Sequence, residues 1–449
     1  MTDTVYYILS AVCVCAVLTG INLMSKVKTS VLGNGLSAAA MVLAIALIFI
    51  TRVGEATPAV ICALCIALAA GAGVGIYEAL KAKMIDMPQI IALLNGLGGA
   101  ASALVAAVTA MLGASSAFDA ATAGIALAVG ALTLTGSLIA AGKLARVLDS
   151  KPKSLPHHSA IMAVLAVLFT AGIVLQTVHS GVWAILVALS ALLFGVVFVM
   201  RVGGADMPIT ISLLNALSGV AGGIAGMAIN EPLLVVIGGI VGASGLLLTQ
   251  DMCKAMNRKL ITILTGKTTV VAPAAAATED PAPEETPAEP EKLTFEAVGT
   301  KLQEAKKVII VPGYGMALSQ AQEEVAKLAA ALENRGAEVK FAIHPVAGRM
   351  PGHMSVLLCE ADIDYDKLFM MEDINDEFAG CDIAIVIGAN DVTNPAANTA
   401  EGTPIYGMPV LNVEDAPMAV FCNFDTKPGY AGVPNPLYEI GRASCRERV

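Results

Sequence analysis

Charged residues are scarce in this chain. Only 14% of its 449 residues are Asp, Glu, Lys or Arg, whereas 56% are hydrophobic, and the mean hydropathy is +0.74. Soluble globular domains carry about 25% charged residues, so this composition excludes an ordinary soluble protein and indicates membrane spans. The shortage is confined to the first part of the chain. Apolar blocks continue to about residue 266, and the composition beyond it is that of a globular domain.

Complete metal and P-loop motifs are also missing. The nine cysteines include the pairs Cys13/Cys15 and Cys62/Cys65, but both pairs lie in apolar runs. No second pair or nearby histidine completes a metal site. We therefore interpret the cysteines as small buried hydrophobic residues and expect no metal. The stretch LTGKT is not a P-loop, because Ile261 occupies the position of the motif's first glycine.

Nine apolar blocks are long enough to cross a bilayer, which takes about 20 residues. The first block lacks a basic n-region and a cleavage site, so we expect a retained helix rather than a signal peptide. The predicted spans are 5–24, 31–51, 57–80, 89–112, 120–142, 160–178, 181–200, 209–229 and 233–252.

Basic residues gather in alternate loops between these blocks. Arg52 is the only Lys or Arg in the intervening loops, which also contain Asp119 and Glu231. Because Lys and Arg accumulate on the cytoplasmic side, this asymmetry predicts an amino terminus outside and a cytoplasmic C-terminal third. The basic loop residues are Lys26, Lys28, Lys81, Lys83, Lys143, Arg146, Lys151, Lys153, Arg201, Lys254, Arg258, Lys259 and Lys267.

A segment rich in Pro, Ala and Glu separates the apolar part from the rest. Such a composition cannot build a core and is typical of an extended, semi-rigid tether. We therefore predict a membrane domain over 1–266, a linker over 267–292 and a soluble domain over 293–438. The tail, 439–449, is polar and basic without apolar periodicity.

The soluble part begins with a strand, a glycine turn, a helix and a second strand between residues 306 and 345. Further strand candidates are DIAIVIGAND, MPVLNVE and MAVFCNF. Strands that alternate with helices predict a parallel, Rossmann-like α/β sheet.

The glycine turn suits a nucleotide pyrophosphate. Gly313 and Gly315 would let backbone amides and a helix N-terminus approach a phosphate closely. However, Leu318 occupies the third fingerprint position, and His344-Pro345 replaces the acidic residue that usually ends the second strand and holds a ribose. A nucleotide would therefore not be held in the ordinary dinucleotide manner.

Two further loops are candidates for closing over a nucleotide. HPVAGRMPGHM places Arg349 between glycines, which suits a phosphate or a carboxamide. GANDVTNPAA follows a strand, at the edge where open α/β sheets bind ligands. The alternatives are a surface salt bridge for Arg349 and an Asx turn for Asn390 and Asp391.

Several motifs together resemble the β subunit of proton-translocating nicotinamide nucleotide transhydrogenase, over nearly the whole chain. They are VPGYGMALSQAQ, HPVAGRMPGHM, MEDINDEF, GANDVTNPAA, GMPVLNV and PGYAGVPNPL in the soluble part, and DMP…LLN, TGSLIAAGKL and DMCKAMNR in the membrane part. The resemblance implies hydride transfer between NAD(H) on a partner subunit and NADP(H) on this chain, driven by inward proton flow. It also implies a nucleotide bound in reversed orientation, which accounts for the missing acidic residue.

The binding positions of the family fall on five stretches of this sequence. Together with the glycine turn they are Gly313, Tyr314, Gly315, Met316, Ala317, Val346, Ala347, Gly348, Arg349, Met350, Pro351, Gly388, Ala389, Asn390, Asp391, Val392, Gly407, Met408, Asn423, Phe424, Asp425, Thr426, Lys427, Pro428, Gly429 and Tyr430.

This sequence departs from the family pattern in two places. Where the family has Lys-Arg-Ser around the 2′-phosphate, this chain has Asn423, Phe424 and Asp425. An aspartate repels a phosphate but accepts a hydrogen bond from a 2′-hydroxyl, so NAD(H) joins NADP(H) as a candidate cofactor. The tail EIGRASCRERV replaces a further strand–helix segment, and we expect it to be non-native or truncated.

The membrane part repeats the cassette DMP…LLN from Asp86 and from Asp206. Nine residues separate each aspartate from Asn95 or Asn215, about 13–14 Å of helix rise. That is close to half of a roughly 30 Å hydrocarbon core, so both amides are expected near the midplane. They either form hydrogen bonds between helices or support a proton path.

Asparagine cannot titrate, so neither amide carries the proton itself. In the family a membrane histidine titrates at one of several positions, two of which are Asn95 and Asn215 here. His157, His158 and His179 lie in loops or at span ends, so the titrating histidine is expected on a partner helix.

Two further polar groups join the predicted proton path. Asp206 corresponds to a position near the cytoplasmic exit of the family's channel, and helix capping is the alternative for both aspartates. Ser137 would line the channel or pack against small residues.

We therefore interpret the chain as a transhydrogenase β subunit that contributes no catalytic acid, base or nucleophile. No second dinucleotide site appears in the sequence, so an α subunit or subunits must supply NAD(H) and further membrane helices. The resemblance implies a homodimer of such heteromers in the bacterial inner membrane, with no nucleic-acid partner. The rival interpretations are a transporter or channel gated by a tethered nucleotide sensor, and an inactive, truncated relic.

Overall fold

The computed structural model describes residues 3–24, 27–52, 54, 56–83, 86–149, 152–178, 181–204, 206–256, 259–265, 295–348, 352–401, 403, 405–429, 431–438 and 444–445. Contacts divide the chain into two compact units. One comprises Met1–Leu138, Ile161–Val196 and Leu214–Gly245, and the other Ile139–Ala160, Val197–Leu213 and Leu246–Val449.

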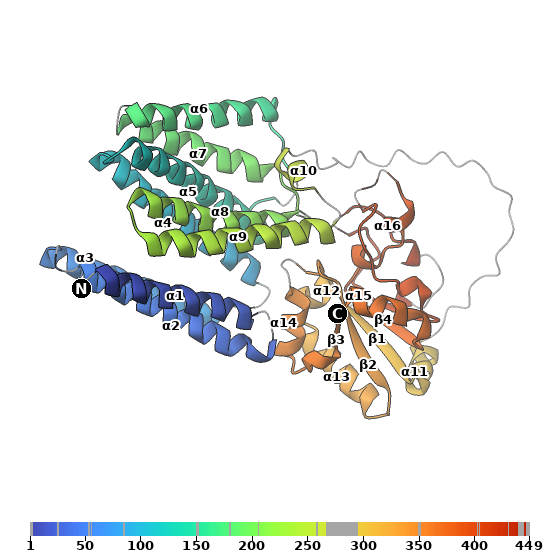
Figure 1. The fold of residues 1–449 in the computed structure, drawn as a ribbon. Helices are drawn as coiled ribbons and strands as arrows, with labels where there is room; N and C mark the ends of the chain where they lie inside the picture. The colour runs from blue at the N-terminus through green and yellow to red at the C-terminus, as the bar shows by residue number, and fades with distance from the viewer. Residues whose placement is uncertain are drawn as a thin grey trace. The chain divides into compact units, whose positions relative to one another are not determined.

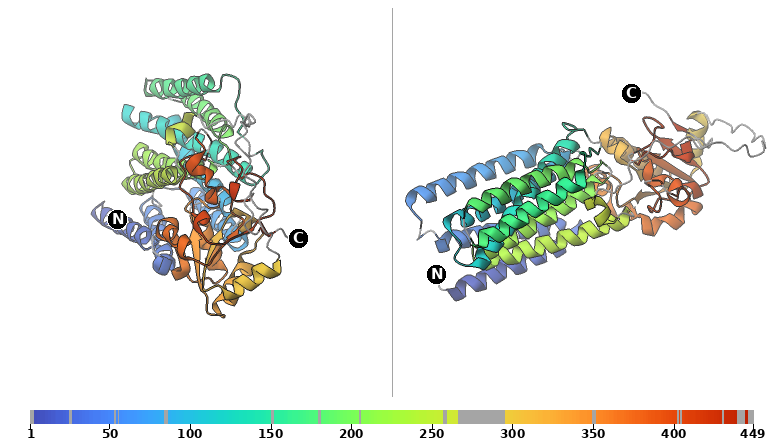
Figure 2. Two further views of the ribbon diagram at one scale, coloured as in Figure 1. Left: turned by 90° about the vertical axis from the view of Figure 1, so that its right-hand side faces the viewer. Right: turned by 90° about the horizontal axis from the view of Figure 1, so that it is seen from above.

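Nine helices among the described residues are long and apolar enough to cross a membrane (Figures 1 and 2). This confirms the number of predicted spans, and each helix overlaps its predicted block. The helices are α1 (Asp3–Met24), α2 (Val27–Arg52), α3 (Pro58–Lys81), α4 (Met87–Leu112), α5 (Ala117–Leu144), α6 (His158–Val178), α7 (Val182–Met200), α8 (Met207–Ala228) and α9 (Pro232–Ala255).

Small residues let these helices approach backbone to backbone. A Cβ atom added to Gly99 of α4 would lie 2.8 Å from the carbonyl oxygen of Gly130 in α5, and one added to Gly130 would lie 2.5 Å from that of Gly99. Gly219 of α8 and Gly242 of α9 pack in the same way, with 2.6 Å from an added Gly219 Cβ to the Gly242 nitrogen. Contacts of this kind hold helices together in lipid, where apolar burial gives no driving force.

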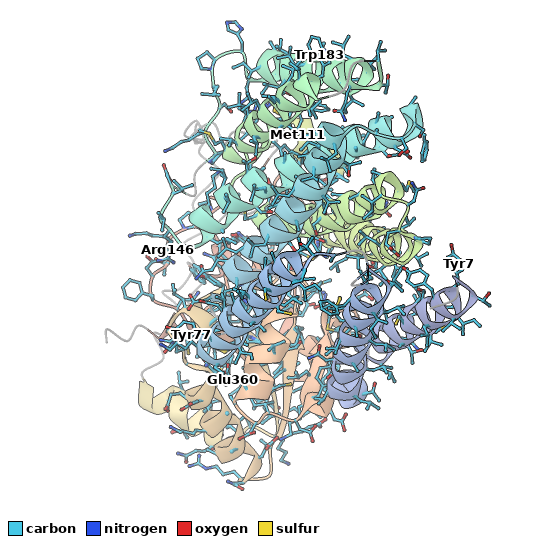
Figure 3. All side chains as sticks on the ribbon, turned by 90° about the vertical axis from the view of Figure 1, so that its left-hand side faces the viewer. Tyr7, Tyr77, Met111, Arg146, Trp183 and Glu360 are labelled. Carbon is cyan, nitrogen blue, oxygen red and sulfur yellow. The ribbon has the colours of Figure 1, made fainter. Side chains whose placement is uncertain are left out.

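Large apolar side chains remain on the outside of the helices. Tyr7, Tyr77 and Met111 project outward from α1, α3 and α4 (Figure 3), and more than half of each is exposed. No residue of α3 is buried. Apolar surface on this scale is out of place in water and suits a hydrocarbon environment, as expected for an integral membrane protein.

The cysteine expectation is only partly correct. Cys13 is buried, but Cys15 on α1 and both Cys62 and Cys65 on α3 are exposed. Helical periodicity explains the difference, because α1 turns Cys15 away from the face that buries Cys13, and α3 buries no face at all.

The C-terminal part folds as the predicted α/β domain around a parallel sheet. The strands are β1 (Lys307–Pro312), β2 (Glu338–Ile343), β3 (Leu368–Met370), β4 (Ile383–Ile387), β5 (Ala419–Cys422) and the two-residue β6 (Ser444–Cys445), in the order β3-β2-β1-β4-β5-β6. Val308 of β1 pairs with Val339 on one side and with Ile383 on the other. The strand order therefore reverses direction between β1 and β4.

Short helices complete this domain. They are α11 (Phe295–Glu304), α12 (Tyr314–Leu318), α13 (Gln322–Glu333), α14 (His353–Glu360), α15 (Met371–Ile374), α16 (Ala396–Thr399) and the 3-10 turns η3 (Tyr365–Lys367), η4 (Asn375–Gly380), η5 (Asp391–Thr393), η6 (Val413–Asp415) and η7 (Pro436–Tyr438), with α10 (Leu260–Thr265) before the tether. One face of the sheet packs on Phe378 and Ile374 through Ile309 and Val386. Strands buried on both faces read as continuous apolar runs, which is why the sequence revealed β1 and β4.

One predicted strand is absent. The segment MPVLNVE forms no strand and ends in η6. Pro409 has no amide hydrogen to give to a ladder, and the carbonyl oxygens of Pro409 and Val410 accept hydrogen bonds from the side chains of His344 and Asn375. The third strand is instead β3, three residues long, which the sequence did not predict.

Candidate functional site

Two glycine turns meet at the carboxyl edge of the sheet. The first joins β1 to α12 and the second follows β4. The amide of Gly313 donates to the carbonyl oxygen of Ile387 and the amide of Gly315 to that of Gly388, both at 2.8 Å. Gly388 has a φ of +66°, and a Cβ atom on Gly315 would lie 2.7 Å from the Gly388 Cα. Only glycines permit this contact.

This contact lies where the strand order reverses between β1 and β4. In open α/β sheets ligands bind at the carboxyl ends of the strands at such a point. The structure thus brings two sequence-predicted stretches, 313–317 and 388–392, to the position where that topology binds nucleotides.

The backbone amides of the first turn are largely engaged within the protein. Besides Gly313 and Gly315, Met316 donates its amide to the Gly313 carbonyl oxygen at 3.1 Å. Tyr314 places its ring 6.4 Å from that of His353, between centroids. The turn therefore joins β1 to the loop after β4, and it leaves fewer free amides for a pyrophosphate than the fingerprint suggests.

The loop after β5 is fastened onto the loop after β4. Asn390 donates from Nδ2 to the carbonyl oxygen of Lys427 at 2.9 Å, and an Asp391 carboxylate oxygen accepts from the amide of Ala431 at 3.0 Å. Gly429 lies against Asp391, since an added Cβ would sit 2.5 Å from its Oδ1. Asn390 and Asp391 therefore tie two loops together instead of forming the local Asx turn that was the alternative.

Asn423 has a structural part in this arrangement. Its Nδ2 donates to the carbonyl oxygen of Ala389 at 3.0 Å and to the Tyr438 hydroxyl at 2.5 Å, and Tyr438 donates to the same Ala389 oxygen. Burial, and then the nearby Asp391 carboxylate, raise the pKa of Tyr438, so its hydroxyl stays protonated as a donor. Sequence reasoning missed Tyr438, because no local pattern marks a contact over 49 residues.

Residues 424–428 of the loop after β5 are exposed. Phe424 is 89% exposed. Asp425 accepts from the amide of Lys427 at 3.2 Å and forms an ion pair with its ammonium group at 3.7 Å. Lys427, a cation in the loop that lacks the family's Lys-Arg pair, is therefore already partly neutralised by its neighbour.

The loop after β2 brings in the fourth stretch. His344 is 1% exposed; its Nε2 lies 2.8 Å from the carbonyl oxygen of Pro409, and its Nδ1 accepts from the amide of Val346 at 3.2 Å. Gly348 has a φ of +106° and packs on the ring of His353. The predicted site residues Arg349, Met350, Pro351 and Tyr430 lie outside the described residues.

The fifth stretch, Gly407 and Met408, is also tied to this edge. Gly407 donates its amide to Ala397 at 2.7 Å, and Leu411 donates to the carbonyl oxygen of Val392 at 2.9 Å. Hydrogen bonds therefore join 313–317 and 423–430 directly to 388–392. The other two stretches are linked only through neighbouring residues, Val346 through His344 to Pro409 and Gly407 to Ala397.

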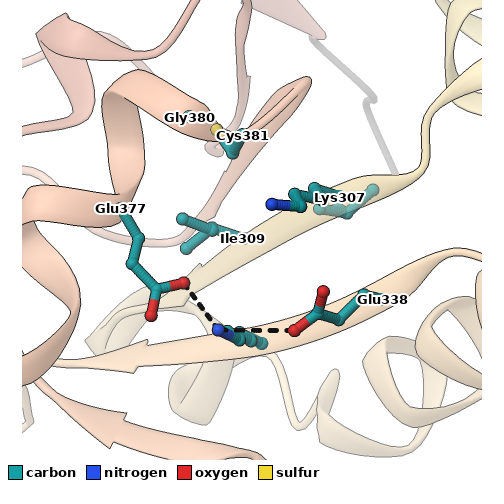
Figure 4. Close-up of a pocket in the computed structure, with 8 residues that line it drawn as sticks. Lys307, Ile309, Glu338, Glu377, Gly380 and Cys381 are labelled. Atoms are coloured by element: carbon teal, nitrogen blue, oxygen red, sulfur yellow. Dashed lines mark hydrogen bonds and ion pairs between the residues drawn. The ribbon is translucent and has the colours of Figure 1, made fainter.

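A cavity of about 320 Å³ lies at the opposite, amino-terminal edge of the sheet (Figure 4). Lys340 donates to Glu377 at 2.6 Å and pairs with Glu338 at 3.3 Å, and the Glu377 hydrogen bond is the first cause of a raised pKa for Lys340. With Lys307 the lining carries two cations and two anions, so it offers no net charge to a phosphate. This cavity is not the nucleotide site that the sequence predicts.

The residues fit a dinucleotide at the carboxyl edge. Gly313, Gly315 and Gly388 bring no side chain to the crossing of the two turns, where an added Cβ would meet the backbone of the other turn. Thr426 and Lys427 are exposed beside it. The fit to a 2′-phosphate is poorer, because Asp425 faces Lys427.

The polar residues predicted for the proton path are buried or half-buried. Asn95 is 6% exposed and Ser137 is fully buried, and an added Cβ on Gly96 would lie 3.1 Å from the Ser137 Cβ. On α8, Ser218 donates to the carbonyl oxygen of Asn215 at 2.8 Å. The first unit thus brings α4 and α5 together beside Asn95 and Ser137.

The aspartates of the two cassettes differ. Asp206 is 4% exposed, directly before α8. Asp86 is the N-cap of α4, but its side chain accepts from Gln89 instead of capping the backbone. Side-chain capping, the alternative weighed for Asp86, is therefore wrong.

The sequence is similar to those of known proteins along most of its length. The family model of the NAD(P) transhydrogenase beta subunit matches residues 3–444. Two curated relatives, both named "NAD(P) transhydrogenase subunit beta" and both from Rhodospirillum rubrum, one of them of a named strain, are each 40% identical over 388 residues. The match covers 83% of this chain and 82% of each relative. This chain belongs to the family of NAD(P) transhydrogenase beta subunits.

Proposed function

We propose that this chain binds NADP(H) at the carboxyl edge of its sheet and exchanges hydride with NAD(H) held by a partner α subunit. The observation that carries the proposal is the joining of the turns at Gly315 and Gly388 at the point of strand reversal, in a member of this family. NADP(H) supplies the hydride chemistry when it is bound. The chain's own residues bind and orient it and exclude water.

The five connected stretches have separate parts in this proposal. The turns at 313–317 and 388–392 carry the dinucleotide, the segments 346–351 and 407–408 flank it, and the loop 423–430 covers it. Arg349 would supply a charged hydrogen bond to a phosphate or carboxamide. Since NAD(H) must also be bound, the α subunit brings a second nucleotide domain and further membrane helices, in a homodimer of heteromers.

Hydride transfer is proposed to be coupled to proton movement through the membrane helices. Asn95, Ser137, Asp206 and Asn215 would line that path, with Asn95 and Asn215 holding water or hydrogen bonds without titrating. The loop charges support an amino terminus outside and a cytoplasmic α/β domain in a bacterial inner membrane. The proposed domains are 1–266, a linker over 267–292 and 293–438, with 439–449 as a tail whose residues Ser444 and Cys445 form β6 beside β5.

Nucleotide binding by the purified full-length chain tests the first step. Calorimetric titration with NADPH and with NADH should give saturable binding, and Arg349→Ala should weaken it by roughly 1–3 kcal/mol, the size of a lost charged hydrogen bond. Arg335→Ala, at the far end of α13 from the turn at 313–317, is the matched control and should bind as the wild type. Failure of the wild type to bind either nucleotide would refute the proposal, and unchanged binding by Arg349→Ala would remove that residue from the site.

A further inference from the structure

His344 occupies an unusual position for a histidine in a nucleotide-binding fold. It directly follows β2, where an acidic residue usually holds a ribose, yet its side chain is buried and faces the protein. Desolvation lowers the pKa of His344 to about 4, and the hydrogen bond to Pro409 only partly opposes this. The ring is therefore neutral at physiological pH and cannot act as a cation toward phosphate.

The two ring nitrogens have different partners, and these fix the tautomer. The amide of Val346 donates to Nδ1 at 3.2 Å, so Nδ1 must be the unprotonated nitrogen. The proton is on Nε2, which donates to the carbonyl oxygen of Pro409 at 2.8 Å. The ring thus bridges the loop after β2 and the segment 407–411, which are 65 residues apart at this bond.

The segment 407–411 is itself anchored at both ends to the β4 side of the sheet. Gly407 donates to the carbonyl oxygen of Ala397 at 2.7 Å, and Leu411 donates to that of Val392 at 2.9 Å. Through Pro409 the His344 ring therefore ties the loop after β2 to residues that belong to the loop after β4. These two loops lie on opposite sides of the strand reversal at β1.

We propose that His344 is a positioning residue that holds Val346–Gly348 and Gly407–Met408 at a fixed separation around the nucleotide. The inference rests on the proposed function, because it assigns both stretches to one nucleotide site. It also gives a reason for the replacement of the usual acidic residue. The position serves to join two walls of the site instead of holding a ribose.

Two substitutions separate this bridge from the local turn. His344→Gln places an amide nitrogen where Nε2 lies, so it can still donate to Pro409. His344→Asn keeps an acceptor for the Val346 amide, as in an Asx turn, but is too short to reach Pro409. If the His344 side chain only filled space, glutamine and asparagine at this position should have the same effect on nucleotide binding, although only glutamine can reach Pro409.

The experiment measures NADPH and NADH binding by the full-length chain in detergent, with hydrogen exchange of the β1 and β4 amides in the same samples. We expect His344→Gln to bind within about twofold of the wild type and His344→Asn to bind about tenfold more weakly, the effect of one lost organising hydrogen bond. At pH 7, where the His344 ring is neutral, exchange protection in β1 and β4 should be equal in all three proteins.

Three results would overturn the inference. They are wild-type binding by His344→Asn, equal weakening by both variants, and loss of β1 and β4 protection in His344→Asn, which would make the ring part of the fold itself. A wild-type chain that binds neither nucleotide would instead refute the proposed function, and this outcome is visible before any variant is compared.

Discussion

The amide of Gly315 donates to the carbonyl oxygen of Gly388 over 2.8 Å, and this bond joins the turn after β1 to the turn after β4. Neither residue can carry a side chain, because each would drive a Cβ atom into the backbone of the other turn. The loop after β5 is tied to the residues that follow Gly388, by Asn423 to Ala389 and by Asn390 to Lys427. Much of the proposed site therefore depends on this one backbone crossing.

Gly388→Ala should destabilise the α/β domain strongly. Alanine at a φ of +66° costs roughly 1–2 kcal/mol, and the overlap with the Gly315–Met316 backbone should bring the total above roughly 3 kcal/mol. Gly336→Ala is the matched control, since its φ is +91° but nothing lies within 4 Å of an added Cβ. Native-state hydrogen exchange of the β1 and β4 amides measures the loss of stability in each variant. Equal losses in Gly388→Ala and Gly336→Ala would show that the two turns are not tightly packed at Gly388.

The loop after β5 should discriminate poorly in favour of NADP(H). Phe424→Arg combined with Asp425→Ser would free Lys427 from its ion pair and supply a second cation, so the ratio of NADPH to NADH affinity should rise about tenfold. Asn423 is left unchanged, because its amide holds Ala389 and Tyr438. Calorimetry with both nucleotides measures the ratio.

Asn423→Lys is the contrasting variant for the same loop. Because it breaks the bonds to Ala389 and Tyr438, it should weaken NADPH and NADH binding alike, whatever charge it adds. A wild-type chain that already prefers NADPH a hundredfold, with no gain in the double variant, would contradict the assignment of this loop.

Stability of the α/β domain should fall in acid because of His344. Its folded pKa of about 4 lies below the ordinary 6.5, so the unfolded chain binds the proton more tightly. Above about pH 6.5 this difference does not affect the free energy of unfolding. As the pH falls from 6.5 toward 4, the free energy of unfolding decreases by about 1.4 kcal/mol per pH unit. Hydrogen exchange between pH 4.5 and 7 should show this slope in the wild type and a smaller one in His344→Gln; identical slopes would place the titration elsewhere.

Asn95→Leu and Asn215→Leu should each slow proton-coupled turnover of the assembled complex about tenfold, equivalent to about 1.4 kcal/mol on the barrier. Leucine fills the space of the amide but can hold neither water nor a hydrogen bond in the membrane. NADPH binding should not change, since the α/β domain is untouched. Leu94→Ala on the exposed side of α4 is the control. Proton uptake and hydride transfer at wild-type rates in both variants would show that the asparagines only stabilise helix packing.

The sequence predicted the elements whose signal is long or repeated. A run of about 20 apolar residues predicts each membrane helix, and a continuous apolar run predicts β1 and β4. It could not predict β3, which has three residues, and it mistook 408–414 for a strand. In that segment the side chains of His344 and Asn375 donate hydrogen bonds to backbone carbonyl oxygens that would otherwise pair with a neighbouring strand.

Within the site, sequence reasoning found the stretches but not their connections. The glycines of the two turns stood out, yet nothing local shows that Gly315 donates to Gly388. The roles of Tyr438 and His344 depend on partners 49 and 65 residues away, and such contacts exist only once the sheet has brought the loops together. Asn423 was expected to face a ligand, whereas its amide nitrogen holds the fold.

The central claim is that this chain exchanges hydride with a partner-bound nucleotide in a reaction coupled to protons. The most direct test reconstitutes the chain with its α subunit in sealed vesicles and measures NADPH formation from NADH and NADP⁺, with and without an imposed proton gradient. We predict that NADPH formation requires both subunits, accelerates when protons flow toward the α/β-domain side, and loses that acceleration when an uncoupler is added. A rate that is indifferent to the gradient and the uncoupler, or one that persists without this chain, would contradict the account.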